Sequence, residues 1–405
     1  MNIAMLSVHS CPVGKIGSKD TGGMSVYIRE LSSELGKQGH LVDIFTRAHD
    51  PMDSEIIELG EGVRLIHLRA GEVKQVNKLR ISSYLDDFSS NLEGFQRRNG
   101  GHYDLIHSHY WLSGCVGGQL QKQWNIPHML MFHTLGAVKN AASVEAYEPD
   151  LRIQGEREVV RDCDSIIAAT DQEREDLIHY YQASANKVSV IPCGINLNLF
   201  HSMNREMARR HLEIDEYRTV LYVGRIESLK GIDTLIKAMT YLQDDERVRL
   251  MIVGGDDQSE TELDKLRSLA TSLGISNLVD FAGLINHEEL PYFYNAADVC
   301  VIPSYYESFG LVVLESLACG TPVVANRVGI VESLLDNHII GYIMDDHEPH
   351  HLAEAIGRIL KNPSERLSII KTAREAVTDF SWECIARDIV EQYRLMLGCR
   401  EAVRC

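Results

Sequence analysis

The chain alternates between short apolar runs and longer segments with helical periodicity. Residues 2–10 form an apolar run that predicts a buried strand, and residues 24–38 repeat apolar positions at helical spacing before Gly39. The same alternation predicts further strands at 41–46, 63–68, 103–107, 128–132, 165–169 and 187–191, and helices at 82–98, 114–124, 150–163 and 171–181. This pattern is typical of an α/β domain with a parallel sheet.

A second alternation follows a break in the pattern. Pro192-Cys193-Gly194 interrupts it and residues 196–204 are polar, so we place the domain boundary there. The later pattern predicts strands at 219–223, 248–254, 279–281, 299–302 and 323–325, and helices at 232–241, 260–273, 287–296, 310–320, 349–361, 364–378 and 382–397. We therefore predict an α/β fold with two doubly wound domains, residues 1–193 and 194–379, and a cleft between them.

Residues 299–329, VCVIPSYYESFGLVVLESLACGTPVVANRVG, read as strand, polar loop, helix and strand. The loop follows the carboxyl end of a strand, and a helix beginning near Gly310 offers free N–H groups to an anion such as phosphate. Glu307 precedes that helix and Glu315 lies inside it. Each could be a plain turn or surface residue, but the helix is apolar nearly all round, and a buried glutamate needs a partner. The pair suits sugar hydroxyls on either side of a phosphate.

Two cations open the second domain at the end of its first predicted strand. In VGRIESLKGIDTLIKAM, Arg225 and Lys230-Gly231 lie between the strand and the helix. They could be surface cations, yet a helix N-terminus is an unfavourable place for structural cations. A guanidinium and an ammonium together can neutralise a diphosphate.

Composition narrows the class of protein. A formal net charge of −18 argues against non-specific binding to nucleic acid or anionic membranes. Nine singly placed cysteines favour reduced thiols in a cytoplasmic protein. The N-terminus lacks a signal-peptide pattern, and no apolar stretch approaches the roughly 20 residues of a membrane span. The sequence does not decide between a monomer and a homodimer.

The first domain carries a diglycine and several histidines near strand ends. Gly22-Gly23 precedes the first helix, where bare backbone can approach a ligand, but it is no GxGxxG nicotinamide-cofactor motif. His9 and His133 each end an apolar strand before a long loop and are expected in the cleft, with His109 nearby. We expect His107 to face into the fold.

Four segments together resemble glycosyltransferase family 4. They are ESFGLVVLE (307–315), GRIESLKG (224–231), TGGMSVYIRELSSELGKQGH (21–40) and HSHYWLSG (107–114). The resemblance covers essentially the whole chain and is strongest to sucrose-phosphate synthases, sucrose synthases and the mycothiol inositol-phosphate N-acetylglucosaminyltransferase. It implies the GT-B architecture of two facing Rossmann-like domains, with a last helix, about 380–405, that packs back on the first domain.

The resemblance also implies roles for individual residues. His133, beside the anomeric carbon, and Arg225, Lys230 and Glu307 would be catalytic. Donor binding would involve, besides those three second-domain residues, Gly23, Leu284, Phe309, Gly310, Leu311 and Glu315, the last on the ribose hydroxyls. The acceptor, which carries a phosphate if Lys78 and Arg152 converge with Thr134, would be bound by His9, Lys78, Tyr110, Thr134 and Arg152.

The implied reaction moves a hexosyl unit, with retention, from a nucleotide sugar that family likeness suggests is UDP-linked. The acceptor would be a hydroxyl of a small molecule such as inositol phosphate or a sugar phosphate. We expect no metal or other cofactor, because the cations already supply charge for the leaving group. A nucleotide-sugar 2-epimerase acting on the donor alone and a catalytically silent sensor are the alternatives, and products formed from donor alone would indicate the epimerase.

Overall fold

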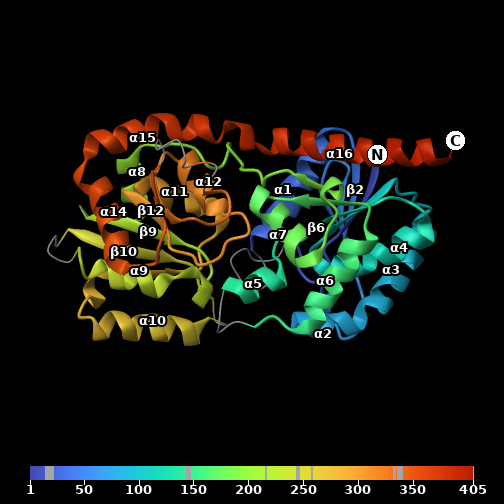
Figure 1. Ribbon diagram of the computed structural model, residues 1–405, viewed down its shortest axis with the longest axis horizontal. Helices are drawn as coiled ribbons and strands as arrows, with labels where there is room; N and C mark the ends of the chain where they lie inside the picture. The colour runs from blue at the N-terminus through green and yellow to red at the C-terminus, as the bar shows by residue number, and fades with distance from the viewer. Residues whose placement is uncertain are drawn as a thin grey trace. The chain divides into compact units, whose positions relative to one another are not determined.

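The computed structural model describes residues 1–13, 22–142, 147–214, 217–242, 247–256, 259–331, 334 and 341–404. Its chain forms two compact units, coloured along the sequence in Figure 1. The first comprises Met1–Gly14, Gly23–Gly194 and Trp382–Cys405, and most of the second is Ile195–Ser381. The break after Gly194 lies one residue beyond the predicted boundary.

An eight-stranded sheet organises the described part of the first unit, in the order β3-β4-β2-β1-β5-β6-β7-β8. The strands are β1 (Asn2–Leu6), β2 (Leu41–Arg47), β3 (Ile56–Gly60), β4 (Val63–Leu68), β5 (Leu105–His109), β6 (His128–Met131), β7 (Ser165–Ala168) and β8 (Val188–Val190). All described pairings are parallel except that of β3 with β4. The strand order reverses direction between β1 and β5, which is where such sheets bind ligands.

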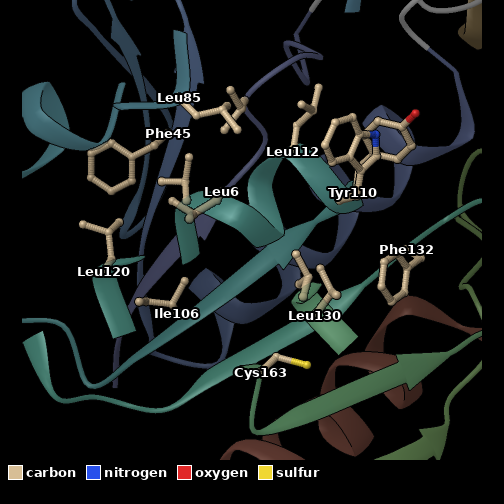
Figure 2. Packing of buried hydrophobic residues seen from close by; sticks show 14 of the residues in the cluster. Leu6, Phe45, Leu85, Ile106, Tyr110, Leu112, Leu120, Leu130, Phe132 and Cys163 are labelled. Atoms are coloured by element: carbon tan, nitrogen blue, oxygen red, sulfur yellow. The ribbon is translucent and has the colours of Figure 1, made fainter. Parts of the chain in front are cut away.

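Helices cover this sheet. They are α1 (Gly23–Lys37), α2 (Lys78–Ile81), α3 (Leu85–Asn99), α4 (Tyr110–Trp124), α5 (Gly136–Ala142), α6 (Asp150–Asp162), α7 (Asp171–Tyr181) and α16 (Trp382–Arg404). Helix α4 packs against α3 and α6, and α1 packs against α16. Buried side chains of α3, α4 and α6 meet those of the strands in one core cluster, and Figure 2 shows part of this cluster, including Tyr110. The last helix is therefore part of the first unit.

The second unit contains a six-stranded parallel sheet in its described residues, in the order β11-β10-β9-β12-β13-β14. The strands are β9 (Arg218–Val223), β10 (Val248–Val253), β11 (Val279–Gly283), β12 (Val299–Ile302), β13 (Val323–Asn326) and β14 (Gly341–Met344). The helices are α8 (Arg205–His211), α9 (Ile232–Met239), α10 (Glu260–Ser272), α11 (Leu290–Ala296), α12 (Leu311–Ala318), α14 (Pro349–Lys361) and α15 (Pro363–Ala376). Its order reverses between β9 and β12.

Several elements differ from the expectation. Strands β3 and β14 and helices α2, α5 and α8 were not predicted, because each is short and none carries a long apolar run. Helix α4 starts at Tyr110, four residues earlier than predicted and directly after β5, and Tyr110 at this junction has a left-handed φ of 73°. The predicted helix at 287–296 begins as a 3-10 turn, and its α-helical part starts only at Leu290. No helix within the described ranges is long and apolar enough to cross a membrane.

A buried glutamate lies in the first turn of α7. The amide of Glu173 donates to Oγ1 of the N-cap residue Thr170 (3.1 Å), and Glu173 Oε2 accepts from the amide of Ala169 (2.6 Å), as in a capping box but shifted to the residue before the N-cap. Its Oε1 is buried with no hydrogen-bond partner among the described residues. Burial raises the pKa of Glu173 from 4.5 to about 7.

Replacing this side chain is expected to change how stability depends on pH. The folded state holds the Glu173 proton more tightly than the unfolded state does, so proton binding at this carboxyl stabilises the fold. This contribution is complete below pH 4.5 and is lost as the pH rises through 7. Glu173→Gln cannot ionise and should not lose this stabilisation. Its free energy of unfolding, relative to that of the wild type, should therefore increase by roughly 3 kcal/mol between pH 4.5 and 7.5. Denaturant unfolding across this range measures the difference. Glu175→Gln, at an exposed position on the same helix, is the control and should track the wild type.

Candidate active site

In the second unit, the loops after β9 and β12 lie side by side. The two strands are paired through Val220 with Val299 and Leu221 with Cys300. A Cβ on Gly231 would lie 2.1 Å from the carbonyl oxygen of Pro303, and Gly231 has a left-handed φ of 63°. Only glycine fits this close approach. The amide of Tyr305 donates to the carbonyl of Leu229 (2.9 Å), which fixes the two loops together.

This arrangement brings two predicted site residues into contact. Lys230 Nζ lies 2.6 Å from Glu307 Oε1, and both side chains are mostly buried. The same carboxylate oxygen accepts a hydrogen bond from Ser304 Oγ (3.0 Å). The ammonium and the carboxylate are therefore positioned as one unit although 77 residues separate them in the sequence.

Arg225 is the more exposed of the two predicted cations. Its Nη1 lies 2.6 Å from Glu227 Oε1, and about a third of its side chain is exposed. Its carbonyl accepts a hydrogen bond from Tyr222 Oη (2.9 Å), at the end of β9. The guanidinium thus extends from a fixed backbone toward solvent, where it can reach a ligand at the strand end.

The start of α12 presents backbone amides without a side-chain cap. Gly310, with a φ of 98°, is the residue before the helix, and the first turn contains no acidic residue. Phe309 is buried, and its carbonyl accepts from the amide of Ile330 (2.7 Å). Leu311 is the first helical residue. Free N–H groups at a helix start favour an anion.

Glu315 is buried on α12 and has the partner that its burial demands. Tyr294 Oη donates to Glu315 Oε2 (2.6 Å), and His287 Nε2 lies 3.5 Å from Oε1. Burial raises the pKa of Tyr294 well above its ordinary value, so the phenol stays protonated as a donor. Sequence reasoning missed Tyr294 and His287, because a single tyrosine or histidine on a short segment carries no distinguishing pattern. Leu284, half-buried after β11, lies two strands from β9 in the sheet order.

In the first unit, three neighbouring strands end in polar residues. His9 follows β1, His109 ends β5 with Tyr110 after it, and His133 follows β6. The His9 and Tyr110 rings are 4.4 Å apart, and the guanidinium of Arg152 lies 5.0 Å from the Tyr110 ring centroid. Three of the predicted acceptor-binding residues, His9, Tyr110 and Arg152, are therefore in contact.

Arg152 is fully buried and is held by directed hydrogen bonds. Its Nε donates to Glu156 Oε1 (2.7 Å), and its Nη2 donates to both the carbonyl and Oγ1 of Thr134 (2.9 Å each). Burial alone would lower the pKa of Arg152, but the charges of Glu156 and Glu148 raise it above its ordinary value. The predicted pair Arg152 and Thr134 is thus in direct contact, and the arginine is charged.

Glu156 and its partners were missed by sequence reasoning. This carboxylate is fully buried and also accepts hydrogen bonds from Tyr181 Oη and from the amide of Gly136. The spacing of Arg152 and Glu156, four residues apart on α6, could have indicated the pair. Tyr181 and Gly136 are distant in sequence and gave no signal.

Lys78, the first residue of α2, is close enough to this cluster to influence it. Its charge acts on the pKa of both His9 and Glu148. Burial is the largest cause that lowers the pKa of His9 to about 3, with Lys78 and Arg152 adding to it. His9 is therefore neutral at physiological pH.

His133 contacts a second histidine rather than a charged group. Its Nε2 lies 2.9 Å from His109 Nδ1, and its backbone has a left-handed φ of 62°. Burial lowers the pKa of His133 to about 3, so the ring is neutral. His107 is buried below, with its Nδ1 2.7 Å from Tyr393 Oη of α16. Gly23 is exposed at the start of α1.

Two Rossmann-like units, each with polar and charged side chains where its strand order reverses, define the GT-B class of glycosyltransferases. The chain belongs to glycosyltransferase family 4: the model for "Glycosyltransferase Family 4" matches residues 21–199, and that for "Glycosyl transferases group 1" matches residues 204–376. The protein is thus an enzyme that transfers glycosyl groups.

Particular relatives cover nearly the whole chain. D-inositol 3-phosphate glycosyltransferase of Corynebacterium jeikeium is 38% identical over 97% of this chain and 96% of its own, and that of Corynebacterium urealyticum is 40% identical over 97% and 95%. The structure of sucrose-phosphate synthase from Thermosynechococcus elongatus matches with a TM-score of 0.91 and 36% identity, over 98% of this chain and all of that one. These proteins are what the chain is similar to.

Proposed function

We propose that this protein transfers a hexosyl unit from a UDP-sugar to a hydroxyl of a small phosphorylated acceptor, with retention of configuration. Inositol phosphate and sugar phosphates are the acceptor classes that the similar enzymes suggest by name. The observation that carries the proposal is the buried cluster of Arg152, Thr134, Tyr110 and His9, with Lys78 beside it. A fully buried arginine suits a phosphate, and the neutral side chains of Thr134, Tyr110 and His9 lie in the same cluster.

On this proposal, the second unit binds the donor. Lys230 and Arg225 neutralise the diphosphate, the free amides at the start of α12 add to them, and Glu307 accepts hydrogen bonds from the sugar. The 2.6 Å contact of Lys230 with Glu307 supports this assignment, because a diphosphate and its attached sugar need adjacent cation and acceptor groups. Glu315, oriented by Tyr294, would bind the ribose. The choice of uridine as the base of the donor rests on the family resemblance.

We further propose that the acceptor attacks from the same face that the diphosphate leaves. Double displacement would need a free carboxylate nucleophile. Among the described residues around Arg152, Glu156 is buried and accepts hydrogen bonds from Arg152, Tyr181 and the amide of Gly136. Glu148 is paired with cations. The leaving phosphate would then take the acceptor proton, and the cations rather than a metal would stabilise it. The nine cysteines occur singly along the sequence, which leads us to place the reaction in the cytoplasm.

A donor-by-acceptor screen analysed by mass spectrometry tests the proposal. UDP-, ADP- and GDP-linked glucose and N-acetylglucosamine would be combined with inositol 3-phosphate, fructose 6-phosphate and their dephosphorylated forms. We expect product from a UDP-sugar and a phosphorylated acceptor, and little from its dephosphorylated counterpart. Conversion of donor alone would indicate an epimerase, and a trapped glycosyl-protein adduct would contradict same-face attack.

A further inference from the structure

A carboxylate of the first unit lies among three cations. Glu148 Oε1 is 3.0 Å from Lys139 Nζ and 2.8 Å from Arg152 Nη1, and the glutamate side chain is only 13% exposed. The charge of Lys78 acts on the same carboxylate. Lys78, Lys139 and Arg152 come from α2, α5 and α6, so three separate elements direct positive charge to one position.

The contact between Glu148 and Arg152 is close but poorly directed. Although the oxygen is 2.8 Å away, Arg152 Nη1 is buried with no hydrogen bond of acceptable geometry among the described residues. The other guanidinium nitrogens are satisfied by Glu156 and Thr134. Buried polar groups normally have hydrogen-bond partners. This guanidinium therefore keeps donor capacity that Glu148 does not use.

Neighbouring atoms are also unsatisfied. Tyr110 Oη and His9 Nδ1 are buried without a hydrogen-bond partner in the part of the chain that the structure describes. Their rings are in tilted contact, at an interplanar angle of 38°, and Arg152 lies over the Tyr110 ring. Three unsatisfied polar atoms on residues of one cluster point to a ligand with several hydrogen-bonding oxygens.

The side chain of Glu148 can leave without disturbing its backbone. The amide of Glu148 donates to Asn140 Oδ1 (2.6 Å), and its carbonyl accepts from Asn140 Nδ2 (3.0 Å). These two bonds hold the main chain beside α5. The carboxylate extends from that anchor on rotatable bonds, so it can swing away while the backbone stays in place.

We propose that Glu148 occupies the position of the acceptor's phosphate in the free enzyme, and that the phosphate displaces it and binds between Lys139 and Arg152. Lys139 then becomes a further acceptor-binding residue and Glu148 a competing internal anion that excludes weaker ligands. This inference rests on the proposed function, because it takes the anion to be the phosphate of the acceptor. A phosphate offers more oxygens than a carboxylate and can align one with Arg152 Nη1.

The competition takes place between two charged groups. Burial acts to raise the pKa of Glu148, but the charges of Arg152 and Lys139 outweigh it and bring the pKa down to about 2. Glu148 therefore does not leave by becoming protonated at working pH. The dianion must replace the monoanion, because keeping both beside Arg152 would place like charges in contact.

Two variants and a matched control test the inference. Glu148→Gln removes the competing charge at constant size and should lower the KM for the phosphorylated acceptor by about 3- to 10-fold. Lys139→Gln should raise that KM by about 10-fold, the loss of one charge-assisted hydrogen bond. Asp162→Asn is the control, since Asp162 also contacts one lysine and one arginine, Lys122 (3.1 Å) and Arg161 (2.8 Å). Asp162 lies ten residues along α6 from Arg152, roughly 15 Å away. The KM of Asp162→Asn for the phosphorylated acceptor should therefore equal that of the wild type.

Binding of inorganic phosphate to the full chain can be measured without turnover, as the shift that phosphate causes in the midpoint of thermal unfolding. Glu148→Gln should bind phosphate more tightly than the wild type, and Lys139→Gln more weakly. If Glu148→Gln instead weakens phosphate binding and raises KM, the glutamate only positions the cations and the inference is wrong. If phosphorylated acceptors are used but neither variant changes KM, the inference fails while the proposed function stands. If no phosphorylated acceptor is used and phosphate binding still responds as expected, the anion site stands and the proposed function fails.

Discussion

Lys230→Ala is expected to reduce turnover by about 10²- to 10³-fold, the usual loss when one group stabilising a developing charge is removed. The ammonium is fixed beside Glu307 at 2.6 Å, so its charge is already in place when the diphosphate begins to leave. The variant leaves the mostly buried carboxylate of Glu307 without its cation, which should cost the fold about 1–3 kcal/mol. Steady-state kinetics and thermal unfolding of the same preparation separate the two effects.

The control for this variant is Lys237→Ala. Lys237 lies on α9, and its ammonium is 2.8 Å from Asp233 Oδ2 on the exposed surface of that helix. Its turnover and thermal midpoint should remain close to those of the wild type. A normal turnover rate in Lys230→Ala would contradict the proposal that Lys230 binds the diphosphate. An equal loss of rate in both variants would indicate a general effect of removing a positive charge.

Arg152→Ala should show the largest loss of stability among the variants considered. Arg152 and Glu156 are both fully buried, and removing the arginine leaves the carboxylate without its charge partner. Breaking such a pair costs about 3–5 kcal/mol, and the KM for the phosphorylated acceptor should rise as well. Denaturant unfolding and acceptor kinetics measure the two consequences.

A double variant distinguishes the structural role of Arg152 from its proposed binding role. Arg152→Ala combined with Glu156→Gln removes the stranded charge while keeping an acceptor for Tyr181 and the Gly136 amide. We expect it to recover part of the lost stability but none of the acceptor affinity. Recovery of both would mean that Arg152 serves the fold alone.

The parts of the fold that could be predicted are those whose signal is local. Strands such as β1 and β12 are buried on both faces and appear as continuous apolar runs, whereas β3 alternates between exposed and half-buried positions and was missed. The family assignment depended on motifs of eight to twenty residues, and the comparisons confirm it.

Contacts between distant segments could not be predicted. Glu315 was expected to be buried with a partner, but Tyr294 became visible only when α11 was placed beside α12. Likewise, nothing in the sequence indicates that Glu148 contacts both Lys139 and Arg152, because these contacts join residues of α5, α6 and the segment just before α6. Roles predicted for the individual site residues remain predictions.

The last helix has a consequence for biosynthesis. Trp382 packs against Tyr27 and leaves no room for a side chain at Gly194, and Tyr393 bonds to the buried His107. The first unit therefore lacks α16 until the intervening residues 195–381 of the second unit have been translated. Until then the α1 surface that α16 covers stays exposed in the nascent chain.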